Sequence, residues 1–370
     1  MAYDIHQLLE AMIENGASDL HLHVGRAPSL RVSGSVVSIE GAALAPEDTE
    51  ALVQSITPPE HLERLKRDGG CDYGFSFHKK ARFRVNVYRG KGVLGMVLRL
   101  IPAKMFTLEQ LRLPPMIKDL LRRPRGLILV TGPTGSGKST TLASMIDWIN
   151  QNEDGHIVTI EDPIEYYHGH KNCVVTQREV HNDVPSFADG IRSALRQDPD
   201  VILIGEILDA TTMEAAITFA ETGHLCLATL HSNNADQTLE RILNFFPEVA
   251  HKNILMNLAL NLRAVISLRL VVGVDGRRMP ATEVLINTPM IRDLIRRGQI
   301  HQLKEAMDTS LDEDIHTFDQ SLFRMYKDGK ITLDEALLKA DSRDGLALKI
   351  RLSEGGSAEH DPYGDLYNNQ

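Results

Sequence analysis

The chain has 370 residues, of which 42% are apolar and 24% charged, a composition typical of a globular protein of about two to three domains. The formal net charge is −10, from 40 lysines and arginines against 50 aspartates and glutamates, which disfavours a protein built mainly to bind nucleic acid. No apolar run approaches the ~18 residues of a membrane-spanning helix, and the first residues lack a signal-peptide layout. Cys71, Cys173 and Cys226 are odd in number and widely spaced, which favours a reducing cytoplasm over a disulfide framework or a four-cysteine zinc site.

Residues 1–103 predict a small α+β domain. Ile5 and the apolar residues that follow it at helical spacing predict an amphipathic first helix. Short runs of alternating polarity at 20–24, 30–32 and 83–87 predict strands. Residues 104–115 are rich in proline and predict a linker, in which Thr107–Gln110 forms a capping box that favours a short helix.

Residues 116–350 predict an α/β domain, because apolar runs alternate with amphipathic segments. Leu127–Val130 is a continuous apolar run, as expected of a strand buried on both faces. A β-hairpin is predicted at 265–286, turning at Asp275-Gly276, with helices to about 350. Residues 351–370 are predicted to be disordered. The other predicted elements are strands at 157–160, 201–204 and 225–230 and helices at 138–150, 186–196 and 209–222.

A phosphate-binding loop lies between the first apolar strand and the helix after it, in the pattern G-x-x-x-x-G-K-[ST]. The glycines allow backbone N–H groups to surround phosphate oxygens, and the positive N-terminus of the following helix adds to their effect. Lys138 supplies a cation for the β- and γ-phosphates of ATP, and Ser139 a hydroxyl for Mg²⁺. The predicted nucleotide-binding residues are Gly132, Pro133, Thr134, Gly135, Ser136, Gly137, Lys138, Ser139 and Thr140.

Polar residues follow three further predicted strands. Glu206 comes just after 201–204, where a carboxylate faces the phosphate crevice and can deprotonate the attacking water and hold Mg²⁺ partly through water. Glu161 follows 157–160 and suggests water or metal positioning, although the adjoining Asp162-Pro163 is also a turn signal. His231 ends 225–230 on the phosphate side, while His224 lies at the other end of that strand, so the two cannot share a metal ion.

Four segments together resemble the Walker A, Asp box, Walker B and His box of secretion-type ATPases, in the order of that family. They are Thr131–Ser139, Thr159–Glu165, Asp198–Glu206 and Glu221–His231. More narrowly, residues 1–350 resemble the PilT/PilU retraction ATPases of bacterial type IV pili. The stretches at 223–235 and 239–247 are more similar to the PilU branch.

The resemblance implies a hexameric motor with a PAS-like N-terminal domain and a RecA-like motor domain, which hydrolyses ATP with Mg²⁺ to retract pili in twitching motility. It implies that Arg84 and Arg99 reach the phosphates; taken alone they would be ordinary surface arginines. The expected location is the cytoplasmic face of the inner membrane, peripheral to the bilayer. The expected partner is the pilus platform protein, with a paralogous retraction ATPase as a further candidate and no nucleic acid.

One departure from the family pattern bears on turnover. The family usually has an arginine soon after the Walker B glutamate, where this chain has Leu208. The missing cation keeps open a weakly active accessory ATPase that acts with a paralogue. A motor of the extension or type II secretion branch and a nucleic-acid translocase are two further candidate functions. The missing four-cysteine zinc insertion weighs against the former, and the acidic balance against the latter.

Several smaller signals have plain structural interpretations. His21 and His23 alternate on one strand and predict an exposed strand face rather than a metal site. His168, His170 and Cys173 have ligand-like spacing but are only three candidates in a polar loop. The run from Arg122 to Arg125 predicts a solvated helix end, with contact to an anion or a partner as the competing interpretation. Ile291–Arg296 resembles the family's retraction signature and, by periodicity alone, an amphipathic helix.

Overall fold

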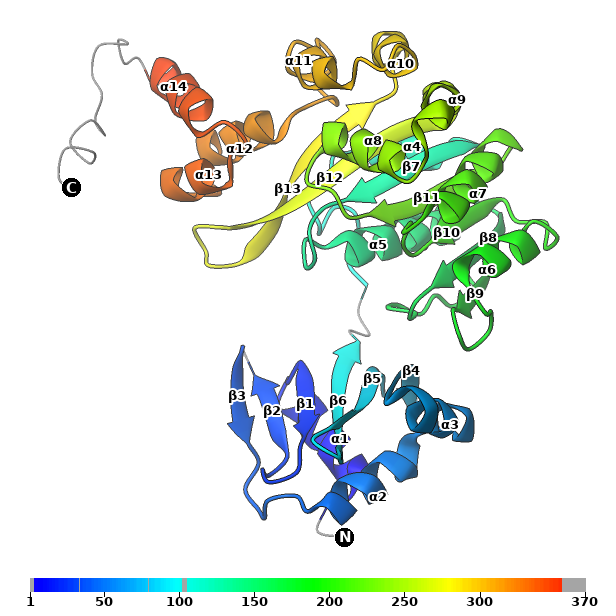
Figure 1. The fold of residues 1–370 in the computed structure, drawn as a ribbon. Helices are drawn as coiled ribbons and strands as arrows, with labels where there is room; N and C mark the ends of the chain where they lie inside the picture. The colour runs from blue at the N-terminus through cyan, green and yellow to red at the C-terminus, as the bar shows by residue number, and fades with distance from the viewer. Residues whose placement is uncertain (1–2, 33, 79, 102–104, 355–370) are drawn as a thin grey trace. The chain divides into compact units, whose positions relative to one another are not determined.

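The computed structural model describes residues 3–32, 34–78, 80–101 and 105–354, which divide into two units (Figure 1). The first unit comprises Met1–Met105 together with two short segments from later in the chain, Asp162–Tyr167 and Glu179–Asp183. The second unit contains the remainder. The predicted domain boundary at residue 103 lies outside the described residues.

The first unit is built on an antiparallel sheet in the order β3-β2-β1-β6-β5-β4. Helix α1 contributes Leu8, Leu9 and Met12 to a core that it shares with the inward-facing residues of the sheet. This is the small α+β domain that the sequence predicts. Its elements are α1 (Ile5–Glu14), β1 (Asp19–Leu22), β2 (Ser29–Val32), β3 (Ser35–Ser38), α2 (Pro46–Ile56), α3 (Pro59–Asp68), β4 (Gly70–Phe77), β5 (Ala81–Gly90) and β6 (Val93–Ile101).

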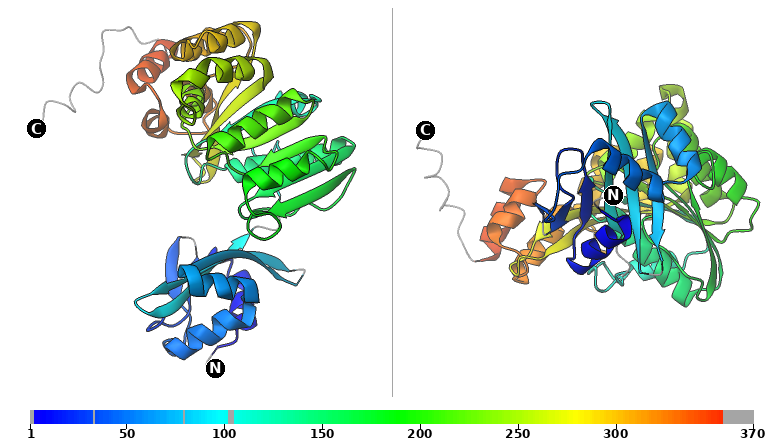
Figure 2. Two further views of the ribbon diagram at one scale, coloured as in Figure 1. Left: turned by 45° about the vertical axis from the view of Figure 1, so that its right-hand side comes forward. Right: turned by 90° about the horizontal axis from the view of Figure 1, so that it is seen from below.

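The second unit contains a seven-stranded sheet in the order β13-β12-β7-β11-β10-β8-β9 (Figures 1 and 2). Neighbouring strands from β12 through β8 are parallel, and β12 and β13 form an antiparallel hairpin. The predicted α/β fold with a mostly parallel sheet is confirmed. The strands are β7 (Gly126–Thr131), β8 (Gly155–Glu161), β9 (Cys173–Glu179), β10 (Val201–Ile204), β11 (Leu225–Leu230), β12 (Leu262–Val272) and β13 (Arg278–Ile286).

Helices surround this sheet because its central strands are apolar on both faces. Every residue of β7, β10 and β11 is buried, as the continuous apolar runs predict. One face packs against Met145 and Ile146 of α5 and against Ile117 of α4. The helices of this unit are α4 (Ile117–Leu121), α5 (Lys138–Asn152), α6 (Phe187–Ala194), α7 (Ala210–Glu221), α8 (Ala235–Asn244), α9 (Glu248–Asn261), α10 (Pro289–Arg296), α11 (Leu303–Asp308), α12 (Phe318–Lys327), α13 (Leu333–Lys339) and α14 (Arg343–Ser353), with a short 3₁₀ helix at Ile300–Gln302.

A smaller core lies where α12, α13 and α14 pack on the β12–β13 hairpin. Val271 and Met279 of the hairpin contact Phe318, Leu337 and Ile350 of the three helices. The hairpin turns at Asp275-Gly276 as predicted. Helix α14 continues to Ser353, three residues into the segment predicted to be disordered, and the rest of that segment lies outside the described residues.

The short helix predicted after Thr107 does not form. The capping-box hydrogen bonds between Thr107 and Gln110 are present, at 3.0 and 3.2 Å, but the residues after them form turns. Arg112 has a positive φ of 55°, and Pro114 disfavours helical backbone in the residue before it, so the chain becomes helical only at Ile117. Among the described residues, no helix is both long and apolar enough to cross a membrane.

Candidate active site

Four neighbouring strands of the second unit carry the predicted catalytic groups at their carboxyl ends. The phosphate loop follows β7, His231 follows β11, Glu206 lies two residues beyond β10, and Glu161 ends β8. These strands are consecutive in the sheet and parallel to one another. The carboxyl ends of parallel strands meet at one edge of a sheet, where α/β proteins bind their ligands. The fold therefore brings these groups together.

The phosphate loop depends on its glycines. Gly132, Gly135 and Gly137 all have positive φ, at 146°, 78° and 98°. A Cβ atom on Gly132 would lie 2.4 Å from the Ser136 Oγ and 2.5 Å from the Leu268 carbonyl oxygen. Only glycine fits there, and the chain then enters α5 at Lys138, so the helix N-terminus adjoins the loop.

Lys138 is folded back onto the loop. Its side chain is almost fully buried, and Nζ donates hydrogen bonds to the carbonyl oxygens of Gly132 at 2.9 Å and Pro133 at 3.1 Å. Burial lowers the pKa of the Lys138 ammonium group, and the nearby charge of Glu206 opposes that change. A buried cation whose hydrogen bonds go to neutral groups is poorly compensated, so the site attracts a strong anion.

His231 joins Lys138 to Glu206. Its Nε2 lies 3.0 Å from the Glu206 Oε1, and its Nδ1 lies 3.4 Å from the Lys138 Nζ. Burial and then the charge of Lys138 lower the pKa of His231, while Glu206 opposes them. In the neutral tautomer that fits these contacts, Nε2–H donates to Glu206 and Nδ1 accepts from Lys138. The imidazole therefore orients the carboxylate through Oε1 and leaves Oε2 for water.

A cavity of about 330 Å³ opens beside these groups. Pro133 of the phosphate loop, His231 and Arg241 of α8 are among the residues that line it. Of the predicted site residues, Pro133 and His231 line this cavity, and Lys138 and Glu206 do not. The remaining lining residues are Ser232, Asn233, Gln237, Glu240 and Asn244.

Gly205 and Leu208 lie on either side of Glu206 in the sequence, one packed against the neighbouring strand and the other exposed. A Cβ atom on Gly205 would lie 3.2 Å from both the Glu161 Cα and the Ile160 carbonyl oxygen, which explains why the residue before Glu206 has no side chain. The Gly205 carbonyl also accepts a short hydrogen bond from the Thr229 hydroxyl. Leu208 is 55% exposed, so it presents an apolar side chain to solvent two residues after Glu206.

Glu161 is held by neighbouring polar side chains. Its Oε1 accepts hydrogen bonds from the Thr159 Oγ1 at 2.7 Å and the Gln177 Nε2 at 3.1 Å. Since these donors fix the carboxylate at the end of β8, next to the end of β10, Glu161 is suited to orienting groups near Glu206. Its part in catalysis remains a prediction.

Arg84 and Arg99 lie together in the first unit. They are direct cross-strand partners on β5 and β6, so their side chains share one face of the sheet. The Arg99 Nε donates to the buried Asp19 carboxylate at 2.8 Å, and the Arg84 Nη1 lies 3.7 Å from Glu165 of the same unit. Their approach to a nucleotide remains a prediction.

His21, His23 and His170 make contacts with neighbouring side chains or backbone groups. His21 and His23 stack at 6.1 Å between ring centroids and are half-buried, so the predicted exposed face is wrong. The reason is that β1 is an inner strand, and the Tyr88 hydroxyl lies 2.9 Å from the His23 Nδ1. The His170 Nδ1 accepts the backbone N–H of Val175. Nowhere in the described ranges do three histidine, cysteine or acidic side chains gather as a metal site.

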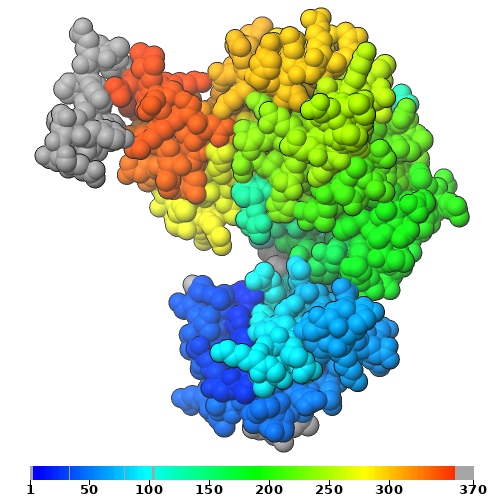
Figure 3. Space-filling model, in the orientation of Figure 1, coloured from blue at the N-terminus to red at the C-terminus, as the bar shows by residue number. Residues whose placement is uncertain are grey.

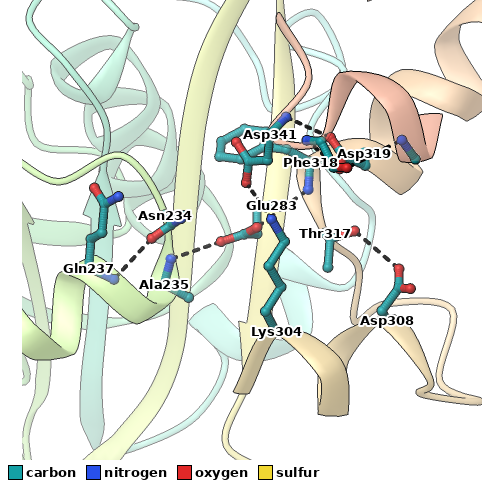
Figure 4. Close-up of polar contacts among 12 residues, drawn as sticks. Asn234, Ala235, Gln237, Glu283, Lys304, Asp308, Thr317, Phe318, Asp319 and Asp341 are labelled. Atoms are coloured by element: carbon teal, nitrogen blue, oxygen red, sulfur yellow. Dashed lines mark hydrogen bonds and ion pairs between the residues drawn. The ribbon is translucent and has the colours of Figure 1, made fainter. Parts of the chain in front are cut away.

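Sequence analysis missed one buried carboxylate close to this site. Glu283 on β13 is almost fully buried, and it accepts the backbone N–H of Ala235 at 2.8 Å and that of Phe318 at 3.4 Å (Figure 4). These are the first residues of α8 and α12, so one carboxylate caps two helices. Helix α8 begins four residues after His231, and Glu283 therefore anchors the segment that carries this histidine.

The ionisation of Glu283 predicts a pH dependence of stability. Burial raises the pKa of its carboxyl group from 4.5 to about 7, the capping N–H of Ala235 opposes the rise, and Asp341 and Asp236 add to it. The folded chain therefore keeps a proton that the unfolded chain loses near pH 4.5. As the pH rises from there through 7, the free energy of unfolding should fall by roughly 3 kcal/mol from this group alone.

Glu283→Gln isolates that contribution, because the amide does not titrate. The single tryptophan, Trp148 on α5, reports unfolding of the second unit by fluorescence. Between about pH 5 and pH 8, the urea midpoint of the wild type should fall more than that of the variant. Glu335→Gln is the matched control. Glu335 also accepts a backbone N–H, that of Val272 at 2.8 Å, but its side chain is only half-buried. Equal pH shifts in wild type and Glu283→Gln would contradict the assignment.

The sheet, the phosphate loop and the polar groups at the strand ends define a P-loop ATPase. Residues 1–276 match the family described as type II/IV secretion system protein. The chain is 45% identical to the type IV pilus ATPase PilU of Pseudomonas aeruginosa, over 96% of this chain and 94% of that protein. It is 42% identical to the type IV pilus retraction ATPase PilT of the same organism, over 91% and 98%.

Solved structures agree with these relatives. A crystal structure of the pilus retraction motor PilT with bound ADP superposes with a TM-score of 0.88 at 42% identity, covering 94% of this chain and 99% of that one. The chain belongs to the type II/IV secretion system protein family and, within it, to the PilT/PilU type IV pilus retraction ATPases. The predicted recognition, enzyme class and fold are confirmed.

Proposed function

We propose that this protein is a homohexameric motor at the cytoplasmic face of the inner membrane, where it hydrolyses ATP to retract type IV pili. The observation that carries the proposal is the chain of contacts from Lys138 through His231 to Glu206 beside the phosphate loop. These contacts connect Lys138, which is suited to holding phosphate, with Glu206, which is suited to activating water. The full-length likeness to PilU and PilT supports the pilus as the load.

The chemistry follows from this arrangement. The loop N–H groups and Lys138 hold the phosphates of ATP, and the negative charge relieves the poor compensation of the buried ammonium group. Glu206, oriented through Oε1 by His231, accepts a proton at Oε2 from the water that attacks the γ-phosphate. Because Lys138 and Glu206 both contact His231, loss of the γ-phosphate changes the surroundings of the imidazole. His231 is thereby suited to sensing the nucleotide state.

The residues present fit a magnesium ion that arrives with ATP. Mg²⁺ in such sites is held by one or two protein oxygens, substrate phosphates and water, so a cluster of three protein ligands is not required. Ser139 presents an exposed hydroxyl in the first turn of α5, which follows β7, and Glu206 follows β10, two strands away at the same edge of the sheet. When bound, the ion neutralises charge on the phosphates. Ser139 would hold it directly and Glu206 partly through water.

Arg84 and Arg99 are proposed to stabilise charge on the phosphates during hydrolysis. The two arginines lie on one face of the sheet and present two positive charges there. A cation that comes from a separate unit would couple hydrolysis to movement of that unit. Arg84→Ala should lower kcat by about 10³-fold with little change in the Kd for ATP. Arg89→Ala is the control, since Arg89 is exposed on the same strand. An Arg84→Ala enzyme with wild-type kcat would remove Arg84 from the site.

The pilus function is tested in a bacterium whose own copy of this gene carries Glu206→Gln. Twitching zones should collapse and surface pili should accumulate, because pili would still assemble but would not be withdrawn. Restoration of the wild-type codon should reverse both effects. Normal twitching in a strain whose purified variant hydrolyses no ATP would refute the proposal.

A second candidate function rests on Leu208. This exposed, apolar side chain, two residues after Glu206, stands where the family resemblance leads us to expect a cation. An accessory ATPase that binds ATP and depends on a more active paralogue accounts for that substitution. The two functions share the fold and the site, and turnover of the isolated protein separates them.

A further inference from the structure

A cavity of about 370 Å³ in the second unit is lined by four arginines. Arg123 and Arg125 come from the loop between α4 and β7, Arg263 from β12 and Arg292 from α10. Helix α10 lies on the surface of this unit, in gold at the top of Figure 3. Of the described residues, those that complete the lining carry no acid; they are Leu120, Pro124, Ile286 and Asn287.

This cavity is distinct from the nucleotide site. Arg125 directly precedes β7, whereas the phosphate loop follows the last residue of that strand. Six residues of extended chain separate the two ends by about 20 Å. Arg263 lies near the start of β12, which runs parallel to β7, so it belongs to the same amino-end edge of the sheet.

The arginines are positioned by the backbone around them. The Arg263 Nε donates to the Arg125 carbonyl oxygen at 3.0 Å. Its aliphatic part passes directly over Gly126, where a Cβ atom would lie 2.4 Å from the Arg263 Cγ. Gly126 also has a positive φ of 128°. The glycine therefore makes room for the arginine stem and fixes where its guanidinium group lies.

The four cations lack the counterions that their neighbours have. Within the described part of the chain, none of them forms an ion pair, whereas the adjacent Arg122 pairs with Asp119 at 3.3 Å and Glu153 at 3.9 Å. Burial lowers the pKa of the Arg263 guanidinium, and repulsion from Arg125, Arg123 and Arg292 adds to it. Four arginines that the described chain leaves without an acidic partner form a local positive site in a chain of net charge −10, which favours binding of an external anion.

Asn287 lines the cavity and carries a buried polar atom without a partner in the part of the chain that the structure describes. Its side chain is 8% exposed, and its Nδ2 donates to the carbonyl oxygens of Ala259 at 2.9 Å and Leu262 at 2.8 Å. These bonds fix the amide orientation and leave Oδ1 with no partner among the described residues. Because ionised phosphate oxygens accept and do not donate, a bridging water is the partner that would satisfy this buried acceptor beside a bound anion.

We propose that the four-arginine cavity is a second anion site, which binds a phosphate-bearing ligand independently of ATP. Guanidinium groups bind phosphate through paired N–H donors, and the negative charge of a phosphate group would offset part of the positive charge of four arginines. The volume lies within the range of small-molecule sites. The phosphate can come from a soluble phosphorylated molecule or from the headgroup of an anionic phospholipid.

Pyrophosphate is the probe, titrated by calorimetry into the Lys138→Ala protein so that the phosphate loop does not compete. One molecule should bind per chain. Arg123→Gln with Arg292→Gln should weaken binding by at least about tenfold, as expected for loss of two charge-assisted contacts. Arg122→Gln, whose side chain is already paired, should change binding by less than about twofold. Since Arg123 and Arg292 are exposed, an unchanged urea midpoint from Trp148 fluorescence confirms folding.

Vesicle sedimentation identifies the source of the phosphate. Binding of phosphatidylglycerol vesicles, lost in the double variant and absent with phosphatidylcholine, would support the site with a lipid headgroup as its ligand. Binding of pyrophosphate without vesicle binding would support a soluble ligand. Failure of both probes, equal weakening by Arg122→Gln, or binding only of an acidic peptide would overturn the proposal. None of these outcomes bears on ATP hydrolysis, which is measured separately.

Discussion

Replacing Glu206 by glutamine is expected to lower kcat for ATP hydrolysis by about 10³-fold while the Kd for ATP stays within about threefold. The amide keeps the size of the side chain and can still accept the His231 Nε2–H at Oε1. It cannot accept a proton from the attacking water. Binding is preserved because the phosphate loop and Lys138 remain intact, and a slightly tighter Kd would fit the loss of a negative charge near the phosphates.

Glu161→Gln is the matched control for that substitution. Glu161 ends the neighbouring strand, and its Oε1 accepts from Thr159 and Gln177, so its change should have a smaller effect on kcat than that of Glu206. The measurements are single-turnover hydrolysis and equilibrium binding of a fluorescent ATP analogue. If Glu161→Gln lowered kcat as far as expected for Glu206→Gln, and Glu206→Gln left it unchanged, the roles of the two carboxylates would be exchanged.

Lys138→Ala is expected to weaken ATP binding by about 10²-fold or more, because the ammonium group makes charge-assisted contacts to the phosphates. The substitution also removes a buried cation whose pKa is lowered by burial. The nucleotide-free protein should therefore lose little stability, since the desolvation cost of the charge offsets the two lost hydrogen bonds to the loop carbonyls.

Two measurements separate these effects. Calorimetry with ATP gives the Kd, and Trp148 fluorescence in urea gives the stability of the second unit. Lys171→Ala serves as control, because Lys171 pairs with Asp147 on the surface rather than with the loop. A wild-type Kd for ATP in Lys138→Ala would contradict the nucleotide site, whereas a large drop in the urea midpoint would show that Lys138 chiefly supports the loop structure.

The sequence predicted the second unit well because its signals are local. Continuous apolar runs marked strands that are buried on both faces, and the phosphate-loop motif placed Lys138 at the start of α5. The groups after each strand then share one edge of the sheet by the geometry of parallel strands. His231 and Glu206 could therefore be assigned to the same site before their 3.0 Å contact was seen.

What the sequence did not predict depends on burial and on contacts between distant residues. Glu283 is one acid among many in the sequence, and its two capping contacts are 48 and 35 residues away. The run from Arg122 to Arg125 was interpreted as a solvated helix end, and its arginines are exposed, but the sequence did not predict that Arg123 and Arg125 also line a cavity. The other two arginines that line the cavity are Arg263 and Arg292, which come from far along the chain.

The central claim is that this chain is an ATPase in its own right, with Glu206 as the base of a hexameric motor. Steady-state ATP hydrolysis by the purified protein, with its assembly state followed by light scattering, tests that claim most directly. We expect turnover that rises as hexamers form and that is lost in Glu206→Gln. ATP binding with negligible turnover by hexamers of both proteins would contradict it, and would point instead to an accessory ATPase in which Leu208 replaces a needed cation.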